Sequence, residues 1–381
     1  MKKLNWISIT PKSPIHVGEP KPAFSFLPTK DIIPGSVLRG ALAEYLLMQG
    51  RESEIKEFVQ NMRFGFLYPS TYPTLQPLPL PVSALECKKE PGFKSEGSHG
   101  IFDTLLASLA FEELKRFTEF PMPLTFRCKE CDSRMDKTSG FYIKEKGYKK
   151  VEIERTSQTK VAISRRRKAA VGKMLYSITA IKPKNVFVGK IAGDVDKFEV
   201  LIDTLNEVGI GALTTRGYGV VEARRTEIKM EGLEERIKSF NRRLEDVWSD
   251  LVSIALNKEK VPENPAGTYF SVDVLSPAIL RDNNGLRTLK LQLDLGGKRL
   301  SPILFFAQPV FIGGWSTGWG LPKETTYGAG IGSTYVFKVG GEEEFYEELE
   351  RIELEGIGER RDEGYGDVLI CHPFHREVMQ V

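Results

Sequence analysis

The sequence predicts an α+β protein of two related domains, because one glycine-rich segment occurs twice in similar surroundings. Gly209–Gly219 reads GIGALTTRGYG, and Gly356–Gly366, 147 residues later, reads GIGERRDEGYG. Before each copy, apolar residues recur at i, i+4 and i+7, the spacing of one helix face. These aligned residues are Phe198, Ile202 and Leu205 in the first copy and Phe345, Leu349 and Ile352 in the second. A strand is expected after each copy, and two copies of one unit indicate two domains rather than a solenoid.

Both domains are also expected to begin with a similar strand. Residues 4–17 alternate between apolar and polar and contain Ser13-Pro14, and a second such stretch ends in Ser276-Pro277. We therefore expect a first domain over residues 1–228 and a second over 268–381. Between them, residues 229–267 hold a linking helix, since apolar residues recur with period 3.6 over 232–257, and then a proline-containing linker.

The second domain is expected to contain strands at 302–312, 335–339 and 368–370 and a helix from Glu342 to Ile352. Its last residues include Cys371, His372 and His375. Three such residues on a tail are more often unliganded than a metal site.

Composition narrows the class of protein. The chain has 381 residues, 41% hydrophobic and 28% charged, as in ordinary globular proteins. Neither a run of 18 apolar residues nor a signal-peptide core is present, so we expect a cytoplasmic protein without a membrane span. The net charge is only +3, so a nucleic-acid site must come from local clusters of cations. Four cysteines in such a chain argue against a disulfide framework.

The two glycine loops are candidate phosphate-binding segments. Glycine reaches positive φ and lets a backbone approach a ligand, and a loop lined with N–H groups suits phosphate. Ordinary turns use glycine in the same way, but matched spacing in two copies favours a shared role. Neither loop has the spacing of a P-loop, and neither follows a strand and opens a helix as a dinucleotide fingerprint does.

A second candidate anion site lies near the N-terminus. Residues 31–42 (DIIPGSVLRGAL) predict a Pro-Gly turn and then a helix that Ser36 caps. A helix N-terminus beside such a turn attracts anions, and Arg39 adds a cation. The alternative is a plain capped helix with a solvated Arg39.

Four residues form a candidate zinc site. Cys128 and Cys131 make a C-x-x-C motif, which is typical of a zinc knuckle or a redox pair. The redox reading needs a thioredoxin-like βαβ context, which the flanking sequence lacks. Cys87 and His99 complete a Cys₃His set, although Cys87 as a buried apolar residue and His99 as a turn residue remain the alternative. Such a closed site would stabilise an insertion at 83–150, in the first domain, that has little core of its own. A helix of about 20 residues is expected within it, after His99.

Residues 144–173 are the most basic part of the chain. They include Arg165, Arg166, Arg167 and Lys168 in succession. Alternation from Tyr148 to Ile153 and from Val161 to Ile163 predicts a β-hairpin that projects as a basic arm. Such an arm suits a phosphate backbone. A solvated surface is the alternative, but four adjacent cations repel one another, which favours a bound polyanion.

These motifs together resemble a protein family. A first strand, the sequence IPGSVLRG at residues 33–40, further strands and G-x-G-x₅-G-x-G at 209–219 are similar to a RAMP domain of CRISPR systems, and residues 356–366 match the loop again. The resemblance implies two ferredoxin-like βαββαβ domains, related to RNA-recognition modules. The doubled domain resembles the Cas-five-like RAMP subunits. The cysteine and histidine set and the segment Gly172–Tyr176 are similar to the Csx-ten subunit of type III-D effectors.

The resemblance implies a non-catalytic role in antiviral defence. Such subunits bind the 5′ handle of the CRISPR RNA and contact the large Cas-ten subunit and a neighbouring backbone RAMP subunit. The implied RNA-binding residues are His16, Ser36, Arg39, Arg165, Arg166, Arg167, Lys168, Gly209, Gly211, Arg216, Gly217, Tyr218, Gly219, Gly356, Gly358, Arg360, Arg361, Gly364, Tyr365 and Gly366. Asp362 and Glu363 stand in the second loop where the first has Thr215 and Arg216, which argues against phosphate binding there unless Arg360 and Arg361 compensate.

An alternative reading is a Cas-six-like repeat endoribonuclease, because those enzymes share the doubled fold. His16 would then be the general base, assisted by a cation such as Lys173, in metal-independent cleavage through the 2′-OH. Against it, His16 has no evident partner at a useful spacing, the chain is long for that family, and the cysteine cluster is foreign to it.

Overall fold

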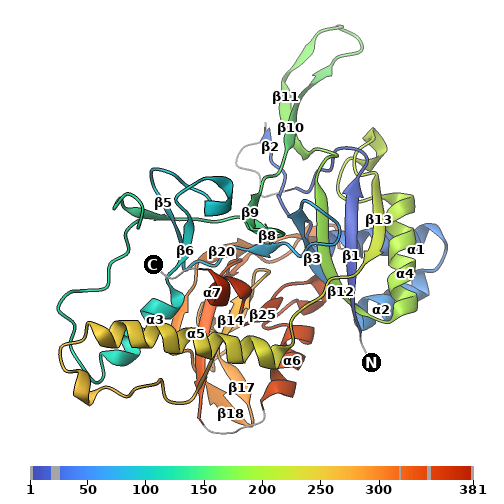
Figure 1. Cartoon of the computed structure of the whole chain (residues 1–381). Helices are drawn as coiled ribbons and strands as arrows, with labels where there is room; N and C mark the ends of the chain where they lie inside the picture. The colour runs from blue at the N-terminus through green and yellow to red at the C-terminus, as the bar shows by residue number, and fades with distance from the viewer. Residues whose placement is uncertain (1–2, 19–25, 317–318, 341–344, 379–381) are drawn as a thin grey trace. The chain divides into compact units, whose positions relative to one another are not determined.

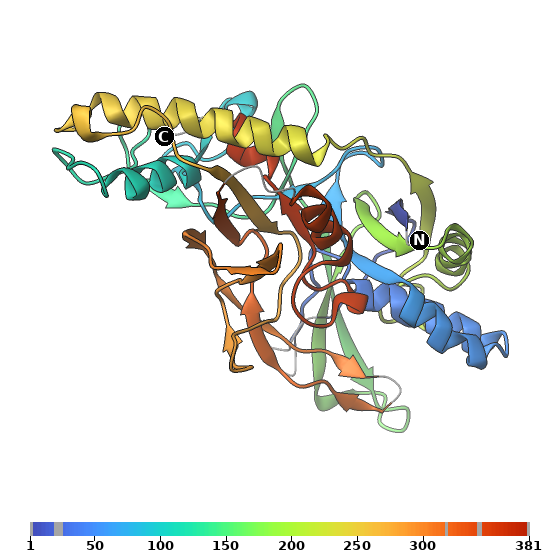
Figure 2. The ribbon, with the colours of Figure 1, turned by 90° about the horizontal axis from the view of Figure 1, so that it is seen from below.

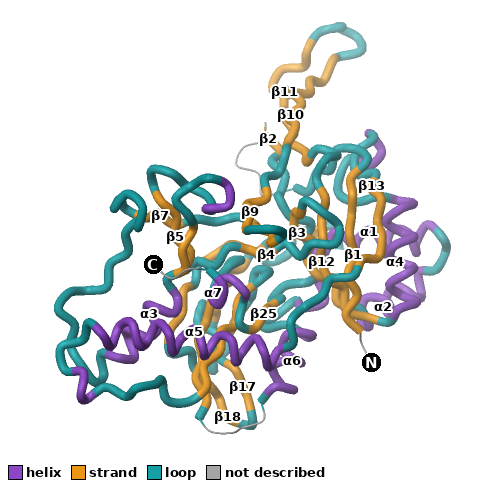
Figure 3. The backbone as a smooth tube through the Cα atoms, viewed as in Figure 1, coloured by secondary structure: helices purple, strands orange, loops and turns teal. Residues whose placement is uncertain are grey.

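The computed structural model describes residues 3–18, 26–316, 319–340 and 345–378. It contains two compact units. The first unit comprises residues 1–77, 151–228 and 362–364, and the second comprises 78–150, 229–361 and 365–381. The predicted α+β class is confirmed, since helices and short antiparallel sheets alternate along the chain (Figure 3).

The first unit is built on a four-stranded antiparallel sheet with the order β13-β1-β12-β3. Its strands are β1 (Lys3–Pro11), β3 (Arg63–Ser70), β12 (Val186–Gly193) and β13 (Val221–Thr226). β1 is central, with Ile7 opposite Gly189 on one side and Arg225 on the other. Alternate side chains on β1 such as Ile7 and Ile9 are fully buried, as the period of a strand requires.

Helices α1 (Gly35–Met48) and α4 (Val195–Val208) of the first unit pack against each other and against this sheet. Their apolar stripes, for example Leu38 and Leu42 on α1 and Phe198 and Leu205 on α4, share one core with the sheet. Helix α2 (Glu52–Asn61), which the sequence did not indicate, buries only Phe58. Helix α4 confirms the helix that was predicted before the first glycine loop.

A long β-ribbon extends from the first unit (Figure 1). It consists of β10 (Arg155–Ile163) and β11 (Ala170–Ile181), and β11 also pairs with β2 (Phe26–Leu27). We call β10, β11 and their connecting residues the basic arm. The hairpin predicted within 144–173 is therefore present but shifted, because Tyr148–Val151 (β9) pairs with β8 (Phe141–Lys144) instead.

The second unit has a sheet of the same design, with the order β19-β24-β14-β25. Its strands are β14 (Thr268–Val274), β19 (Leu304–Phe306), β24 (Thr334–Val339) and β25 (Val368–Ile370), and α6 (Tyr346–Glu355) lies between β24 and β25. No helix occurs between β14 and β19, where all residues are described and form two small hairpins instead. The strand predicted at 302–312 is split, since β20 (Pro309–Ile312) pairs in a separate ribbon with β23 (Thr326–Ala329).

Two further helices cover apolar surface in the second unit. α5 (Leu233–Ser253), the predicted linking helix, lies beside α3 (Leu105–Leu114) (Figure 2). Both bury their apolar faces in one core with the sheet, through residues such as Leu105, Leu109, Phe240 and Phe270. The insertion predicted to belong to the first domain therefore packs with the second unit, and its helix is half the expected length.

The short helix α7 (Pro373–Glu377) follows β25. The remaining strands are β4 (Leu78–Pro79), β5 (Ala84–Cys87), β6 (Ile101–Asp103), β7 (Met135–Lys137), β15 (Leu280–Arg281), β16 (Arg287–Thr288), β17 (Leu293–Leu295), β18 (Lys298–Leu300), β21 (Trp315–Ser316) and β22 (Leu321–Pro322). Among the described residues, every helix is too short or too polar to cross a membrane.

Candidate nucleic-acid interface and metal site

The two glycine loops have the same backbone design. Positive φ angles occur at Gly209, Gly211, Leu213, Gly217 and Gly219, and 147 residues later at Gly356, Gly358, Arg360, Gly364 and Gly366. In the first loop, Ile210 N donates to Gly219 O at 2.9 Å, and in the second, Ile357 N donates to Gly366 O at 2.8 Å. The predicted repeat is therefore a repeat of main-chain geometry.

The segments containing Ser-Pro complete each loop in the same way. Gly219 N donates to Pro14 O, and Gly366 N donates to Pro277 O, both at 2.9 Å. Ser13 Oγ accepts from Val220 N at 3.0 Å, and Ser276 Oγ accepts from Asp367 N at 2.8 Å. Each serine hydroxyl thus bonds the start of the strand after the glycine loop to the segment that follows the first strand of the sheet.

Several glycines are required by close backbone packing. A Cβ on Gly219 would lie 2.1 Å from Ile210 O, and one on Gly366 would lie 1.8 Å from Ile357 O. Because the loop amides named above donate to carbonyl groups of the chain, they are not a cradle of N–H groups for phosphate. The exposed part of the first loop is limited to Thr214–Gly217 around Arg216, together with Gly211 and Ala212.

The first glycine loop contacts the basic arm. Arg216 Nη1 donates to Tyr176 Oη on β11 at 3.2 Å, and the buried Tyr218 donates its hydroxyl to Gln158 Oε1 on β10 at 2.7 Å. The exposed Arg216 therefore continues the surface of the arm. RNA contact by Arg216 and by Tyr218 stays a prediction, and only 6% of Tyr218 is exposed.

The basic arm carries its charge at an exposed tip. Residues 155–181 contain seven Lys or Arg residues and no acidic residue. Arg165, Arg166, Arg167 and Lys168 form the turn between the two strands and are all exposed. Ser164 fastens the turn, because Lys168 N donates to its carbonyl at 2.8 Å and Arg167 N to its hydroxyl at 3.2 Å.

The N-terminal anion site is organised differently from the prediction. Pro34, rather than Ser36, occupies the N-cap position of α1, and no side chain caps the helix. Ser36 lies in the first turn and is half-buried. Arg39 pairs with Asp362 at 2.5 Å and lies 3.6 Å from Glu363, two residues that belong to the same unit. Carboxylates of the chain therefore pair with Arg39, the cation that was predicted to bind RNA.

His16 lies beside the first glycine loop but is buried. Its carbonyl accepts from Ala212 N at 2.9 Å, and its Nδ1 is 2.8 Å from Thr179 O. Since a carbonyl accepts only, Nδ1 carries a proton in this contact. The side chain is 6% exposed, which favours a structural role.

The charged side chains of the second glycine loop are partly engaged by other residues of the chain. The Arg360 guanidinium lies 4.8 Å over the Tyr365 ring, and the exposed Arg361 lies 3.6 Å from Glu355. Glu359 accepts from Arg281 and Arg287, and the bond from Arg281 is the main cause that lowers the pKa of its carboxyl. Binding of RNA by Gly356, Gly358, Gly364, Gly366 and these arginines stays a prediction.

The four predicted zinc ligands lie together in the second unit. Cys87, His99, Cys128 and Cys131 have their ligand atoms within 4.8 Å of one another. His99 Nδ1 is 3.4 Å from Cys87 Sγ and 3.5 Å from Cys128 Sγ, and Cys87 and Cys131 are 3.6 Å apart. Zinc–ligand bonds of roughly 2.0–2.3 Å at tetrahedral angles separate ligand atoms by about 3.5–3.8 Å. The spacing fits a metal ion.

Strands and a tight knuckle present these ligands. Cys87 ends β5, opposite Met135 of β7, and Cys128 begins a turn in which Asp132 N returns to Cys128 O at 2.8 Å. Burial raises the pKa of Cys87, but a hydrogen bond from Ser133 and two from backbone amides outweigh it and lower the pKa to about 6. The bond from Ser133 also lowers the pKa of Cys131. Thiolates are the form that binds a metal.

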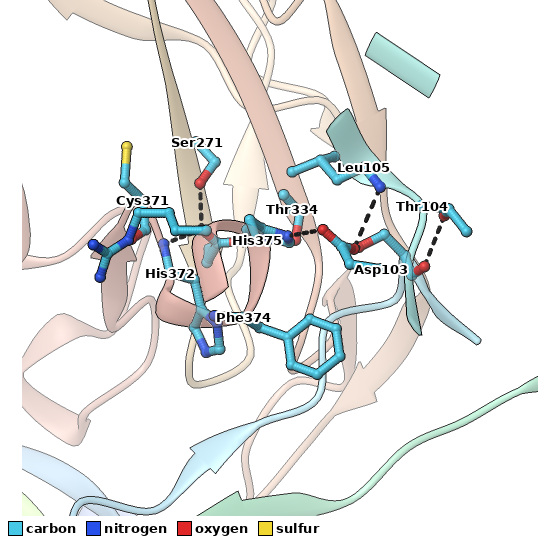
Figure 4. Close-up of polar contacts among 12 residues, drawn as sticks. Asp103, Thr104, Leu105, Ser271, Thr334, Cys371, His372, Phe374 and His375 are labelled. Atoms are coloured by element: carbon cyan, nitrogen blue, oxygen red, sulfur yellow. Dashed lines mark hydrogen bonds and ion pairs between the residues drawn. The ribbon is translucent and has the colours of Figure 1, made fainter. Parts of the chain in front are cut away.

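Sequence reasoning missed a buried network in the second unit (Figure 4). His375 on α7 contacts Asp103 through Nδ1 and Asp273 through Nε2, both at 2.8 Å. All three side chains are at most 4% exposed. The sequence places His375 on a tail, and its partners lie 272 and 102 residues away, so no local pattern connects them.

Several solved structures resemble the chain at low sequence identity. One chain of a type III-B Cmr-beta complex bound to cognate target RNA and AMPPnP is 13% identical over 87% of this chain and 86% of its own, with a TM-score of 0.41. A chain of a Csm3-Csm4 subcomplex from a type III-A interference complex is 16% identical over 89% and 92%, with a TM-score of 0.35. Cmr6 from Pyrococcus furiosus is 11% identical over 59% and 99%, with a TM-score of 0.25.

No curated protein matches the sequence. The sequence model described as the RAMP superfamily matches residues 8–222, more than half of the chain. The match includes the end of β1, both helices that pack on the first sheet, the basic arm and the first glycine loop. The chain belongs to the RAMP superfamily.

Proposed function

We propose that the chain is a non-catalytic, RNA-binding subunit of a type III CRISPR effector complex. In this role it binds the 5′ handle of the CRISPR RNA and docks the large Cas-ten subunit and a neighbouring RAMP subunit, in the cytoplasm, in antiviral defence. Membership of the RAMP superfamily and the motif resemblance to Cas-five-like subunits support the class. In both sheets the outer strands are the last and the second in chain order, which supports a ferredoxin-like arrangement of the strands. In the second unit, two hairpins at residues 275–303 stand in place of the first helix of a βαββαβ unit.

The observation that carries the RNA-binding role is the exposed basic arm beside Arg216. The arm has seven cations and no acid, and although Arg155 pairs with Asp31, the four exposed cations of the tip create a positive field that suits a phosphate backbone. Arg216 reaches Tyr176 on the arm, so cations from the first glycine loop and from the arm lie on one continuous surface. A single strand of RNA laid along this surface would meet cations at several successive phosphates.

We propose further that the chain does not cleave RNA itself. The endoribonuclease alternative requires His16 to reach a 2′-OH, whereas this side chain is 6% exposed and its Nδ1 is bonded to Thr179 O. A general base must come within about 3 Å of the proton that it removes. Burial of His16 supports the non-catalytic role.

Zinc is proposed as a structural ion at Cys87, His99, Cys128 and Cys131. Four protein ligands leave no open position for a substrate, as in structural zinc sites. The site joins β5 to the knuckle at residues 128–133 in a part of the unit with a small core of its own. Zinc would there fix the fold of the segment rather than take part in chemistry.

Labelled repeat RNA in a buffer without added divalent metal or chelator tests the function. The fourfold variant R165A/R166A/R167A/K168A should bind the RNA more weakly, with the slope of log K against log salt reduced by up to about 0.7 for each phosphate that the arm no longer neutralises. The matched control is R299A, because Arg299 is an exposed arginine that pairs with Asp294 at 2.9 Å in the other unit. An unchanged slope in the fourfold variant would remove the arm from the RNA site. A discrete cut by the native protein, lost in H16A, would instead identify a processing nuclease.

A further inference from the structure

The second unit carries a second projecting ribbon, with a different chemistry. It comprises residues 309–316 and 319–329, in which β20 pairs with β23 and β21 with β22, and we call it the aromatic ribbon. Phe311 is 81% exposed, Trp315 60%, Trp319 83% and Tyr327 39%. Phe311 lies directly opposite Tyr327, so their rings share one face. Leu321, also in the ribbon, is 57% exposed.

The base of the ribbon is held firmly. Ile312 and Ala329 are buried, and Ala278 and Ala329 exchange two backbone hydrogen bonds of 2.8 Å. Tyr327 donates its hydroxyl to Arg287 O at 2.7 Å. A Cβ on Gly328 would lie 2.3 Å from Ala278 O, so the ribbon backbone is pressed against its support. Phe311 and Tyr327, whose rings lie at this base, are therefore presented by a fixed backbone, which lowers the entropy lost on binding.

The exposed aromatic area is close to that of a protein interface. At roughly 200 Å² for each large ring, the exposed fractions leave on the order of 500 Å² of aromatic surface. One side of a standard protein interface buries about 800 Å². Summed over the four side chains, this exposure lies in the range of about 300–600 Å² that the largest apolar patch of a monomer reaches, and such patches are often functional.

Charge decides between protein and RNA as the occupant. The aromatic ribbon holds one lysine and one glutamate over residues 309–329, so its own net charge is zero. Arg360 lies beside Gly314 of the ribbon, with its guanidinium stacked over the Tyr365 ring. The basic arm has seven cations and only one aromatic residue over 155–181. RNA binding depends on cations that neutralise phosphates, and the centre of a protein interface is rich in Trp, Tyr and Phe and poor in charge. The basic arm thus has the composition of an RNA-binding surface, and the aromatic ribbon has that of a protein-binding surface.

We infer that the aromatic ribbon docks into an uncharged, apolar groove on a neighbouring protein subunit, with Trp315 and Trp319 as its main anchors. The inference rests on the proposed function, because that function supplies the neighbouring subunits. Tryptophan is among the residues that dominate interface energies, and truncation of such an anchor commonly weakens binding by tenfold or more.

The experiment uses the full chain, the purified large subunit and the purified backbone RAMP subunit of its effector complex, and handle RNA. The variant is W315S/W319S, whose side chains are 60% and 83% exposed and so contribute little to the core. The control is L256A, an apolar residue that is 58% exposed and lies outside the ribbon. We expect at least about tenfold weaker association of W315S/W319S with one of the two subunits. Association of L256A, and RNA binding by both variants, should equal those of the native chain.

Acrylamide quenching adds a direct readout. Of the four tryptophans, Trp248 is buried, whereas Trp315 and Trp319 are exposed, so quenching of the free chain should fall when the partner covers the ribbon. Normal assembly by W315S/W319S would overturn this inference alone. Handle RNA that protects the tryptophans by itself would assign the ribbon to RNA, and concentration-dependent protection of the chain alone would assign it to a second copy. Failure of the native chain to join either subunit would overturn the docking part of the proposed function as well.

Discussion

At the scale of single residues, His375 is a charged side chain enclosed by two carboxylates. Burial alone would lower the pKa of this imidazole, but Asp103 and Asp273 outweigh burial and raise it to about 10. In return, burial raises the pKa of Asp273, and His375 outweighs that effect and lowers it to about 2. Ser271 and Thr334 also donate to Asp273, at 2.6 and 2.7 Å. The buried charge of His375 is stabilising only while both Asp103 and Asp273 are present.

Replacement of His375 should therefore have a strongly pH-dependent effect. The raised pKa of His375 stabilises the fold fully below about 6.5, its unfolded value, and this contribution is lost as the pH rises through about 10. The lowered pKa of Asp273 stabilises the fold above about 4 and is lost as the pH falls through about 2. H375A should lower the free energy of unfolding by about 3–5 kcal/mol near pH 5, and by much less near pH 10. Denaturant titrations at several pH values measure this.

The neighbouring His372 is the matched control. Burial lowers the pKa of His372 to about 3, so this residue is neutral in the fold and stabilises least in acid. H372Q should therefore differ from the native protein least at low pH, the opposite trend. A pH-independent effect of H375A would show that the imidazole is buried in its neutral form.

The zinc site gives a second prediction at the residue scale. C128S should lose the metal, because a three-ligand remnant no longer forms a closed tetrahedral site. The control is C371S, since Cys371 is equally buried but lies outside the cluster. Metal analysis of the purified proteins should find about one zinc per chain in the native protein and in C371S, and none in C128S. Zinc retained by C128S would contradict the assignment.

The cluster of Cys87, His99, Cys128 and Cys131 could be predicted because the chain offers few candidates of this chemistry. The chain has four cysteines and four histidines, and only one C-x-x-C motif. Asp103 and Asp273 could not be predicted, because aspartates are common and only the fold brings them to His375. Ser36 was predicted as a cap from its type and position, whereas the chain turns into the helix two residues earlier, at Pro34.

At the scale of elements, each glycine loop is a rigid connection between a helix and a strand. Five residues in each loop have positive φ, and four of these five are glycine. The sequence predicted a helix, loop and strand in both copies, because the spacing of glycine and apolar residues determines them locally. The second helix is Tyr346–Glu355, and residues 342–344, where it was expected to begin, lie outside the described residues. The sequence did not predict that the loop amides bond to the chain itself, since the acceptors Pro14, His16, Pro277 and Ile279 lie about 80 to 205 residues away along the sequence.

Alanine substitutions in the first glycine loop separate the cost of backbone strain from the cost of a steric clash. G217A should destabilise by about 1 kcal/mol, because its φ is +83° but a Cβ would meet nothing within 4 Å. G219A has a similar φ of +80°, and its Cβ would lie 2.1 Å from Ile210 O, so the loss should be at least twice as large. Chemical denaturation of both variants measures the difference. Equal losses would mean that the loop relaxes around the added methyl group.

At the scale of the whole molecule, the two compact units are not the two halves of the sequence. One change from the first unit to the second falls between residues 228 and 229, whereas residues 78–150 leave the first half and join the second unit. The repeat could not reveal this, because the segment has no counterpart in the other copy. Its helix α3 was expected from its apolar residues, whereas the surface that covers them, α5, is more than a hundred residues further along.

This arrangement predicts how the chain behaves when it is divided. In a fragment of residues 1–228, Leu105, Leu109 and Leu114 of α3 lose the core formed with α5 and the second sheet. Each buried leucine contributes roughly 1.5–3 kcal/mol, so the fragment should bind a hydrophobic dye and exchange the amide protons of α3 rapidly. A fragment of residues 229–381 should also be unstable alone. Co-expression of the two fragments should restore slow exchange in both α3 and α5, because residues 78–150 then complete the second unit. Slow exchange in α3 of the isolated first fragment would show instead that residues 78–150 fold with the first unit.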